Sequence, residues 1–208
     1  MDLITSIKES CYSQVKCDFE KFDLHGWMPG VFLEFFAKAL SEKSGDVTVL
    51  EVGSWKGRSS NHMAQICKSK PDVNAKIICI DTWLGSPEAI ETMERVNGFP
   101  TVFKTFINNA LFLKNEDIIY PFPIASTQAA HYLISKNFEA DIIYIDAGHE
   151  YEAVLLDAKL YWKLLKKGGF MIFDDYAIKS VIKAVDEFLA DKDAVKVFKD
   201  SQVLVHKI

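Results

Sequence analysis

The chain has 208 residues, 49% hydrophobic and 25% charged, a composition typical of one globular domain and not of a disordered segment. Its formal net charge of −5 argues against a nucleic-acid partner, since phosphate binding depends on clustered Lys and Arg. No run approaches the roughly 20 apolar residues that span a bilayer, the start lacks a secretory signal pattern, and the 4 cysteines lack CxxC spacing. We therefore expect a cytoplasmic protein with reduced thiols and no membrane partner.

Two helical patterns come first, at residues 2–20 and 28–44. In the second pattern, Val31, Phe35 and Leu40 share an apolar face, while Glu34 and Lys38 lie mostly on the other side. We interpret residues 1–45 as an N-terminal helical cap and residues 46–208 as the core of the same single domain.

From residue 47 the pattern changes to an alternation of strands and helices. Short apolar runs predict strands at 47–52, 76–81, 118–124, 141–146 and 169–174. Helix-compatible stretches lie between and after them, at 59–68, 101–113, 126–135, 151–165 and 178–189. The alternation predicts parallel βαβ units, and strands this apolar predict a sheet covered on both faces. The fold class is therefore α/β, a Rossmann-like three-layer sandwich.

Two segments depart from this rhythm. The strand-like runs 194–198 and 202–207 are too close together for a parallel crossover, so they predict an antiparallel hairpin. The sheet is then seven-stranded and mostly parallel, with that hairpin at its C-terminal end. Residues 82–100 form a long irregular segment, of the kind that carries active-site loops.

The loop after the first predicted strand reads EVGSWKG, at residues 51–57. Gly53 and Gly57 allow a tight turn and a close approach of the backbone to a ligand, although glycines here also serve as simple turn formers. The spacing is neither the GxGxxG that binds a pyrophosphate nor a P-loop. It suits a ligand without phosphates.

Asp81 ends the second predicted strand, within reach of the first loop. An acidic residue at this position can accept hydrogen bonds from both hydroxyls of a ribose. The alternative is that Asp81 caps the loop that follows it.

Three aspartates end the fourth and fifth predicted strands: Asp146, Asp174 and Asp175. Carboxylates at neighbouring strand tips repel one another unless something positive lies between them, and oxygen ligands of this kind suit a hard ion such as Mg²⁺. The alternative is that Asp174 or Asp175 caps the next helix. His149, in the turn after Asp146, is a candidate general base, or else forms a hydrogen bond that shapes the loop.

Together these motifs resemble a class I S-adenosylmethionine-dependent methyltransferase over residues 47–188. The matching stretches are VLEVGSWKG, ICIDTW, DIIYIDAGHEYEAVLLD and LLKKGGFMIFDDY. The last two are similar to the small metal-dependent O-methyltransferases of the macrocin and catechol type. The resemblance implies that Asp146, Asp174 and Asp175 bind the metal. It also implies a set of cofactor-binding residues: Glu51, Gly53, Ser54, Trp55, Gly57, Asp81, Thr82, Trp83 and Ser126.

Two departures from those enzymes concern the chemistry. The fifth strand ends in Asp-Asp where catechol-type enzymes usually have Asp-Asn, and the fourth ends in Ile-Asp-Ala-Gly-His where the macrocin-like group often has Ile-Asp-Gly-Asp. The general base is therefore left between His149 and Asp146.

The predicted function is methyl transfer from S-adenosylmethionine to a small hydroxyl compound, assisted by a divalent metal that lowers the pKa of the acceptor hydroxyl. Two rivals remain: an NAD-dependent dehydrogenase of related fold, and a non-catalytic cofactor-binding module. The expected partner is the small acceptor molecule, and a homodimer is left open.

Overall fold

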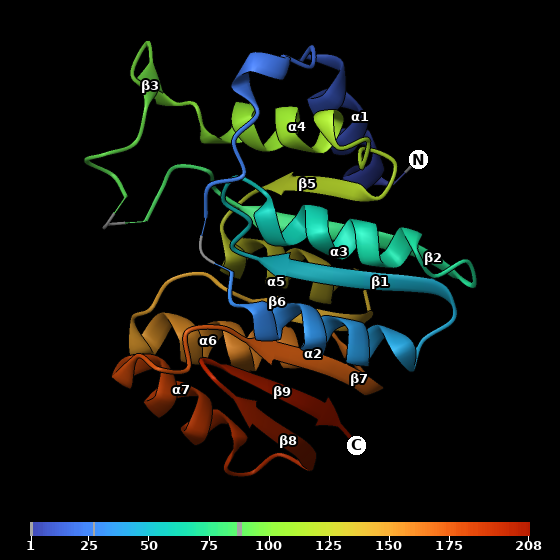
Figure 1. The fold of residues 1–208 in the computed structure, drawn as a ribbon. Coiled ribbons are helices and arrows are strands. Elements are labelled where there is room, and N and C mark those ends of the chain that lie inside the picture. The colour runs from blue at the N-terminus through green and yellow to red at the C-terminus, as the bar shows by residue number, and fades with distance from the viewer. Residues whose placement is uncertain (1, 27, 87–88) are drawn as a thin grey trace.

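A large β-sheet lies at the centre of the molecule (Figure 1). The computed structural model describes residues 2–26, 28–86 and 89–208. In that part of the chain the main sheet has seven strands, in the order β5-β2-β1-β6-β7-β9-β8. They are β1 (Gly45–Val52), β2 (Val73–Asp81), β5 (Ile119–Pro123), β6 (Ala140–Ile145), β7 (Leu165–Phe173), β8 (Ala194–Lys199) and β9 (Gln202–Lys207). The pairs from β5 to β7 are parallel, whereas β9 pairs antiparallel with β7 and with β8. The predicted fold class, including the C-terminal hairpin, is confirmed.

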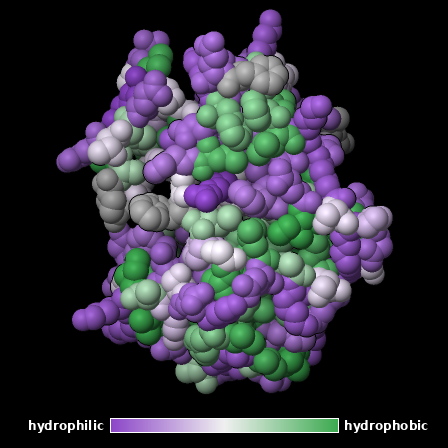
Figure 2. All heavy atoms as spheres, viewed as in Figure 1, coloured by the Kyte–Doolittle hydropathy of each residue, from purple (hydrophilic) through white to green (hydrophobic). Residues whose placement is uncertain are grey.

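Helices cover both faces of the sheet, as strands with no polar face require. One buried cluster lies under α5 (Ser126–Ser135), α6 (Tyr151–Trp162) and α7 (Lys179–Leu189), and the other under α2 (Gly30–Ser41), α3 (Arg58–Lys68) and α4 (Val102–Phe112). The helix α1 (Leu3–Ser13) packs against the edge strand β5. No described helix is both long and apolar enough to cross a membrane. Hydrophobic and hydrophilic residues are mixed over the face drawn in Figure 2.

The first predicted helix is wrong in its second half. α1 ends at Ser13, and the chain then runs mostly extended, with one short 3-10 turn, η1 (Phe19–Lys21). The backbone of this segment makes hydrogen bonds to Asn108 and Asn109 of α4 in place of a helical ladder. Hydrogen bonds to residues distant in the sequence therefore determine this backbone conformation, in place of the local helical propensity.

The irregular segment 82–100 contains a small hairpin that the sequence analysis did not predict. Its strands are β3 (Arg95–Val96) and β4 (Phe99–Pro100), joined by Asn97 and Gly98, which both have positive φ, +52° and +82°. Asn-Gly is the pair favoured by such two-residue turns. Figure 1 shows this segment extending away from the sheet. Pro87, which also belonged to that prediction, lies outside the described residues.

Candidate cofactor and acceptor site

The predicted site residues gather where the strand order reverses, between β1 and β6. Gly53 follows β1, and its N–H donates to Ile80 O at 2.9 Å. Asp146 follows β6, and its N–H donates to Val52 O at 2.9 Å. Ligands of open α/β sheets bind at the carboxyl edge near such a reversal. The two loops therefore frame the crevice in which a ligand is expected.

Gly53 is required by the neighbouring backbone. Its φ is +90°, and a Cβ atom built on it would lie 1.9 Å from the carbonyl oxygen of Asp146. No side chain fits at such a distance. The glycine therefore allows the β1 and β6 loops to touch, in addition to any closeness that it allows to a ligand.

The N–H groups of the 53–57 loop are held by Asp81. The N–H of Ser54 and that of Trp55 donate to its Oδ2 at 2.9 and 2.8 Å, and the N–H of Trp83 donates to its Oδ1 at 2.7 Å. A carboxylate has about four acceptor positions, so one is left for a ligand. Asp81 thus has the loop-capping role left open above, and its geometry fits one ribose hydroxyl better than two.

The carbonyl groups of the same loop are also bonded. Trp55 O accepts from the indole Nε1 of Trp83 at 2.7 Å, and Gly57 O accepts from Nδ2 of Asn61 at 2.7 Å. Trp55 and Trp83 hold positive φ values of +45° and +52°, which side chains rarely adopt unless their surroundings impose it. The loop is therefore preformed in the described structure.

Glu51 lies beneath this loop and is completely buried. Its carboxylate accepts hydrogen bonds from the hydroxyls of Ser54, at 2.7 Å, and of Ser59 and Ser60 at the start of α3. Burial raises the pKa of Glu51, and the serine hydroxyls oppose that rise. Its place is that of a support for the loop; direct contact with a cofactor stays a prediction.

The other predicted cofactor residues lie around the crevice with different exposure. Thr82 is exposed, whereas Trp83 is 2% exposed and packs between Phe103 and Phe106, with ring centroids 4.8 and 4.9 Å away. The ring of Trp83 is thus part of the core. Ser126 begins α5, and its carbonyl accepts from the hydroxyl of Tyr161 at 2.8 Å.

Asp146 and Asp174 come together through a residue that the sequence analysis missed. The hydroxyl of Tyr144, on β6, lies 2.9 Å from Oδ2 of Asp146 and also contacts Oδ2 of Asp174. A tyrosine hydroxyl has one proton to donate, so the second contact is a hydrogen bond only if one carboxyl group carries a proton. Burial, and then the charge of the other aspartate, raises the pKa of Asp146, while burial raises the pKa of Asp174. Both raised pKa values favour a proton on one of the two carboxyl groups, which would reduce the repulsion between them.

Asp175 has a different partner. Its Oδ2 lies 2.9 Å from Nε2 of His149, and its backbone φ is +56°. The carbonyl of His149 accepts from the hydroxyl of Ser180 at 2.6 Å, which fixes the turn that carries the ring. The three aspartates are thus divided between a pair joined by the Tyr144 hydroxyl and an Asp175–His149 pair.

This arrangement does not fit the expected Mg²⁺ site. Among the described residues, no group of three His, Cys, Asp or Glu side chains is placed to hold a metal ion. The carboxyl groups instead have protein partners, namely the Tyr144 hydroxyl at Asp146 and Asp174 and the His149 ring at Asp175. We therefore derive no chemical step through a metal.

A cavity of about 320 Å³ adjoins these aspartates. Its described lining comes from the strand tips, the segment before α2 and the β8–β9 turn: Met28, Pro29, Asp146, Asp174, Asp175 and Ser201. None of these residues is basic. Pockets for small ligands begin at about this volume, roughly 300 Å³.

Comparisons with known proteins identify the family and the fold. Residues 50–176 match a family described as a methyltransferase domain. Uncharacterized protein R132 of Acanthamoeba polyphaga mimivirus is 30% identical over 158 residues, which cover 73% of this chain. The chain spans 63% of the length of R132.

Solved structures of low sequence identity share the fold. The O-methyltransferase NovP is 17% identical, with a TM-score of 0.63 over 85% of this chain and 78% of its own. An O-methyltransferase from Bacillus cereus, solved in complex with SAH, is 12% identical, with a TM-score of 0.62 over 100% of this chain and 92% of its own.

Proposed function

This chain belongs to the methyltransferase-domain family, and from that premise we propose that it moves the methyl group of S-adenosylmethionine to a hydroxyl group of a small molecule. The observation that carries the proposal is the hydrogen-bonded pair of His149 and Asp175, beside a cavity at the carboxyl edge of the sheet. The similar folds NovP and the Bacillus cereus protein are O-methyltransferases, which supports the choice of oxygen as the acceptor atom.

The cofactor would lie against the 53–57 loop. The glycine spacing of that loop suits a ligand without phosphates. Asp81 holds the loop backbone in place, and one acceptor position of its carboxylate remains for a ribose hydroxyl. When bound, S-adenosylmethionine supplies an electrophilic methyl group on its sulfonium. The protein then has to place an acceptor oxygen in line with that methyl group and remove its proton.

His149 is placed to take that proton. Asp175 accepts from Nε2, which leaves Nδ1 of His149 without a partner among the described residues. In this role Nδ1 accepts the hydroxyl proton as the new O–C bond forms, and Asp175 stabilises the imidazolium that results. The side chain of His149 is 41% exposed, so an acceptor can reach it.

The cavity supports a small, uncharged acceptor. Its carboxyl groups accept hydrogen bonds from hydroxyls, and the described residues of its lining offer no cation to a phosphate or carboxylate. The hydrogen bond to Asp175 and the exposed ring make His149 the candidate base for such an acceptor.

The test is a comparison of three variants in a screen for S-adenosylhomocysteine release from small hydroxyl compounds. His149→Ala and Asp175→Asn should each lower kcat by roughly 10²- to 10⁴-fold, because general base catalysis contributes about that much. Their affinity for S-adenosylhomocysteine should not change. His131→Ala, at an exposed position of α5, should behave as the wild type.

Other outcomes separate the rivals. Binding of NAD in place of S-adenosylhomocysteine would favour the dehydrogenase, and cofactor binding without turnover of any acceptor would favour the non-catalytic module. Full activity of the His149→Ala variant would remove His149 from the mechanism.

A further inference from the structure

A segment that crosses from α1 to α2 lies against the cofactor loop, and we call residues 17–26 the strap. Its backbone is clamped by two neighbouring amide side chains of α4. Asn108 accepts from Asp18 N at 2.7 Å and donates to Asp18 O at 3.0 Å. Asn109 does the same with Asp23, accepting from N at 3.0 Å and donating to O at 2.6 Å. Each amide thus satisfies both backbone groups of one strap residue.

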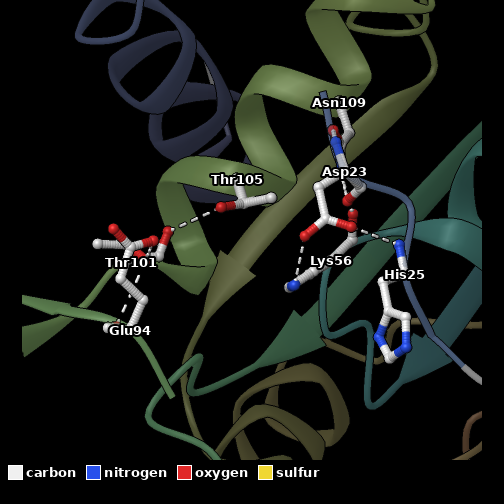
Figure 3. A network of polar contacts seen from close by, with 7 residues as sticks. All are labelled: Asp23, His25, Lys56, Glu94, Thr101, Thr105 and Asn109. Atoms are coloured by element: carbon white, nitrogen blue, oxygen red, sulfur yellow. Dashed lines mark hydrogen bonds and ion pairs between the residues drawn. The ribbon is translucent and has the colours of Figure 1, made fainter. Parts of the chain in front are cut away.

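Asn109 makes one further contact that Asn108 does not. Its Nδ2 also donates to the carbonyl of Lys56, at 2.8 Å, and Lys56 belongs to the 53–57 loop. The side chain of Lys56 reaches back to the strap, with Nζ 2.5 Å from Oδ2 of Asp23. Figure 3 shows Asn109 and Lys56 on two sides of Asp23. Loop and strap are therefore joined twice at this point.

The two amides differ little in other respects. Asn108 is 3% exposed and Asn109 is 0% exposed. A buried amide that loses its partners leaves polar backbone groups unsatisfied, at a cost in stability for either residue. They differ in the hydrogen bond from Asn109 to the carbonyl of Lys56. That carbonyl belongs to the peptide group that joins Lys56 to Gly57. Orientation of that peptide group fixes the turn that leads into α3.

We propose that Asn109 is a positioning residue for cofactor binding, which holds the 53–57 loop in its binding shape by joining it to the strap. The inference rests on the proposed function, because it takes the 53–57 loop as the place where S-adenosylmethionine binds. It adds a residue of α4 to those that determine cofactor affinity.

The test is calorimetric titration of the whole protein with S-adenosylhomocysteine. Asn109→Ala should weaken binding by roughly tenfold, the effect of one or two lost hydrogen bonds, and Asn108→Ala by less than roughly threefold. Both variants should lower the melting temperature. Hydrogen exchange of the 54–57 amides without cofactor should be faster in Asn109→Ala but not in Asn108→Ala.

A second pair of variants covers the case in which Asn109→Ala does not fold. Asp23→Ala removes the ion pair to Lys56 at a partly exposed position. Asp18→Ala removes a side chain whose polar partners among the described residues are Glu20 and Lys21. Asp23→Ala should weaken S-adenosylhomocysteine roughly threefold, and Asp18→Ala should leave its affinity unchanged.

The outcomes are distinguishable from failure of the proposed function. A wild-type protein that binds neither S-adenosylmethionine nor its product would contradict the proposed function itself. Wild-type binding with equal losses in Asn108→Ala and Asn109→Ala would overturn the role of Asn109, because strap stability alone would then explain both. Unchanged affinity in Asn109→Ala, or in Asp23→Ala where the former does not fold, would overturn it as well.

Discussion

At the scale of single residues, the site depends on contacts between the protein's own loops. Gly53 illustrates this, because its missing side chain makes room for the carbonyl of Asp146. The sequence pattern predicted a glycine near a ligand, and the structure adds a backbone contact between two strand tips. A substitution at this position should therefore affect the fold as well as binding.

We predict that Gly53→Ala lowers the free energy of unfolding by about 3 kcal/mol or more, since a Cβ clash and a positive φ both oppose it. Gly30→Ala is the matched control, because a Cβ there meets nothing within 4 Å and its φ lies outside the left-handed region. Urea denaturation of both variants measures the difference. Equal stability of the two would contradict the clash.

The residues that the sequence could and could not predict differ in where their partners lie. Asp81 and Asp146 were predictable as members of the site, because each ends a strand and parallel strands share an edge. The roles of Tyr144 and Asn109 depend on partners 30 and 86 residues away, Asp174 and Asp23. A signal for Asn109 did exist: the pair Asn108-Asn109 interrupts the apolar run of α4, where buried amides require partners.

At the scale of elements, the contact between α5 and α6 contains a buried acid. Asp157 on α6 is 5% exposed, and its Oδ1 has no hydrogen-bond partner among the described residues. Burial raises its pKa from the ordinary value of 3.8 to about 6, and a hydrogen bond with Ser126 opposes that rise. The folded protein therefore holds a proton that the unfolded chain has already lost between these two values.

Because the pKa of Asp157 is higher in the folded protein, the protein becomes less stable as pH rises from about 4 to about 6. In that window the unfolded state binds fewer protons than the folded state. We predict that Asp157→Asn raises the free energy of unfolding at pH 7 by up to about 3 kcal/mol, the equivalent of a shift of about two pKa units. The gain should vanish below pH 4. Melting curves of both proteins from pH 4 to pH 7 measure it, and a gain that does not vary with pH would contradict the assignment to Asp157.

Elements with a strong local pattern were predicted well. The expected helix 126–135 has the bounds of α5, and the expected hairpin 194–198 and 202–207 differs from β8 and β9 by one residue. The hairpin β3–β4 was missed although Asn97-Gly98 is a turn signal, because its strands have only two residues each. Residues 17–20 of the strap were predicted as the end of a helix, because their observed backbone depends on hydrogen bonds to α4.

At the scale of the whole molecule, ligand binding should appear as a gain in stability. We predict that S-adenosylhomocysteine at 100 times its Kd stabilises the protein by about 2.7 kcal/mol, which raises the melting temperature by roughly 5–10 °C for a chain of this size. MgCl₂ alone should give no such shift, because Tyr144 and His149 already partner the three aspartates. Differential scanning calorimetry with each ligand tests both statements, and a clear shift with Mg²⁺ alone would reinstate the metal site.

The hydrogen bonds that hold the backbone of the 53–57 loop have a consequence for how the molecule folds. The donors and acceptors that shape this loop come from Asp81, 26 residues beyond Trp55, and from Asn109, 53 residues beyond Lys56. Contacts of such sequence separation form late, after the entropy of closing long loops has been overcome. A growing chain that has made β1 and α3 alone therefore has no cofactor loop. Cofactor binding would then discriminate between the finished molecule and its partly folded precursors.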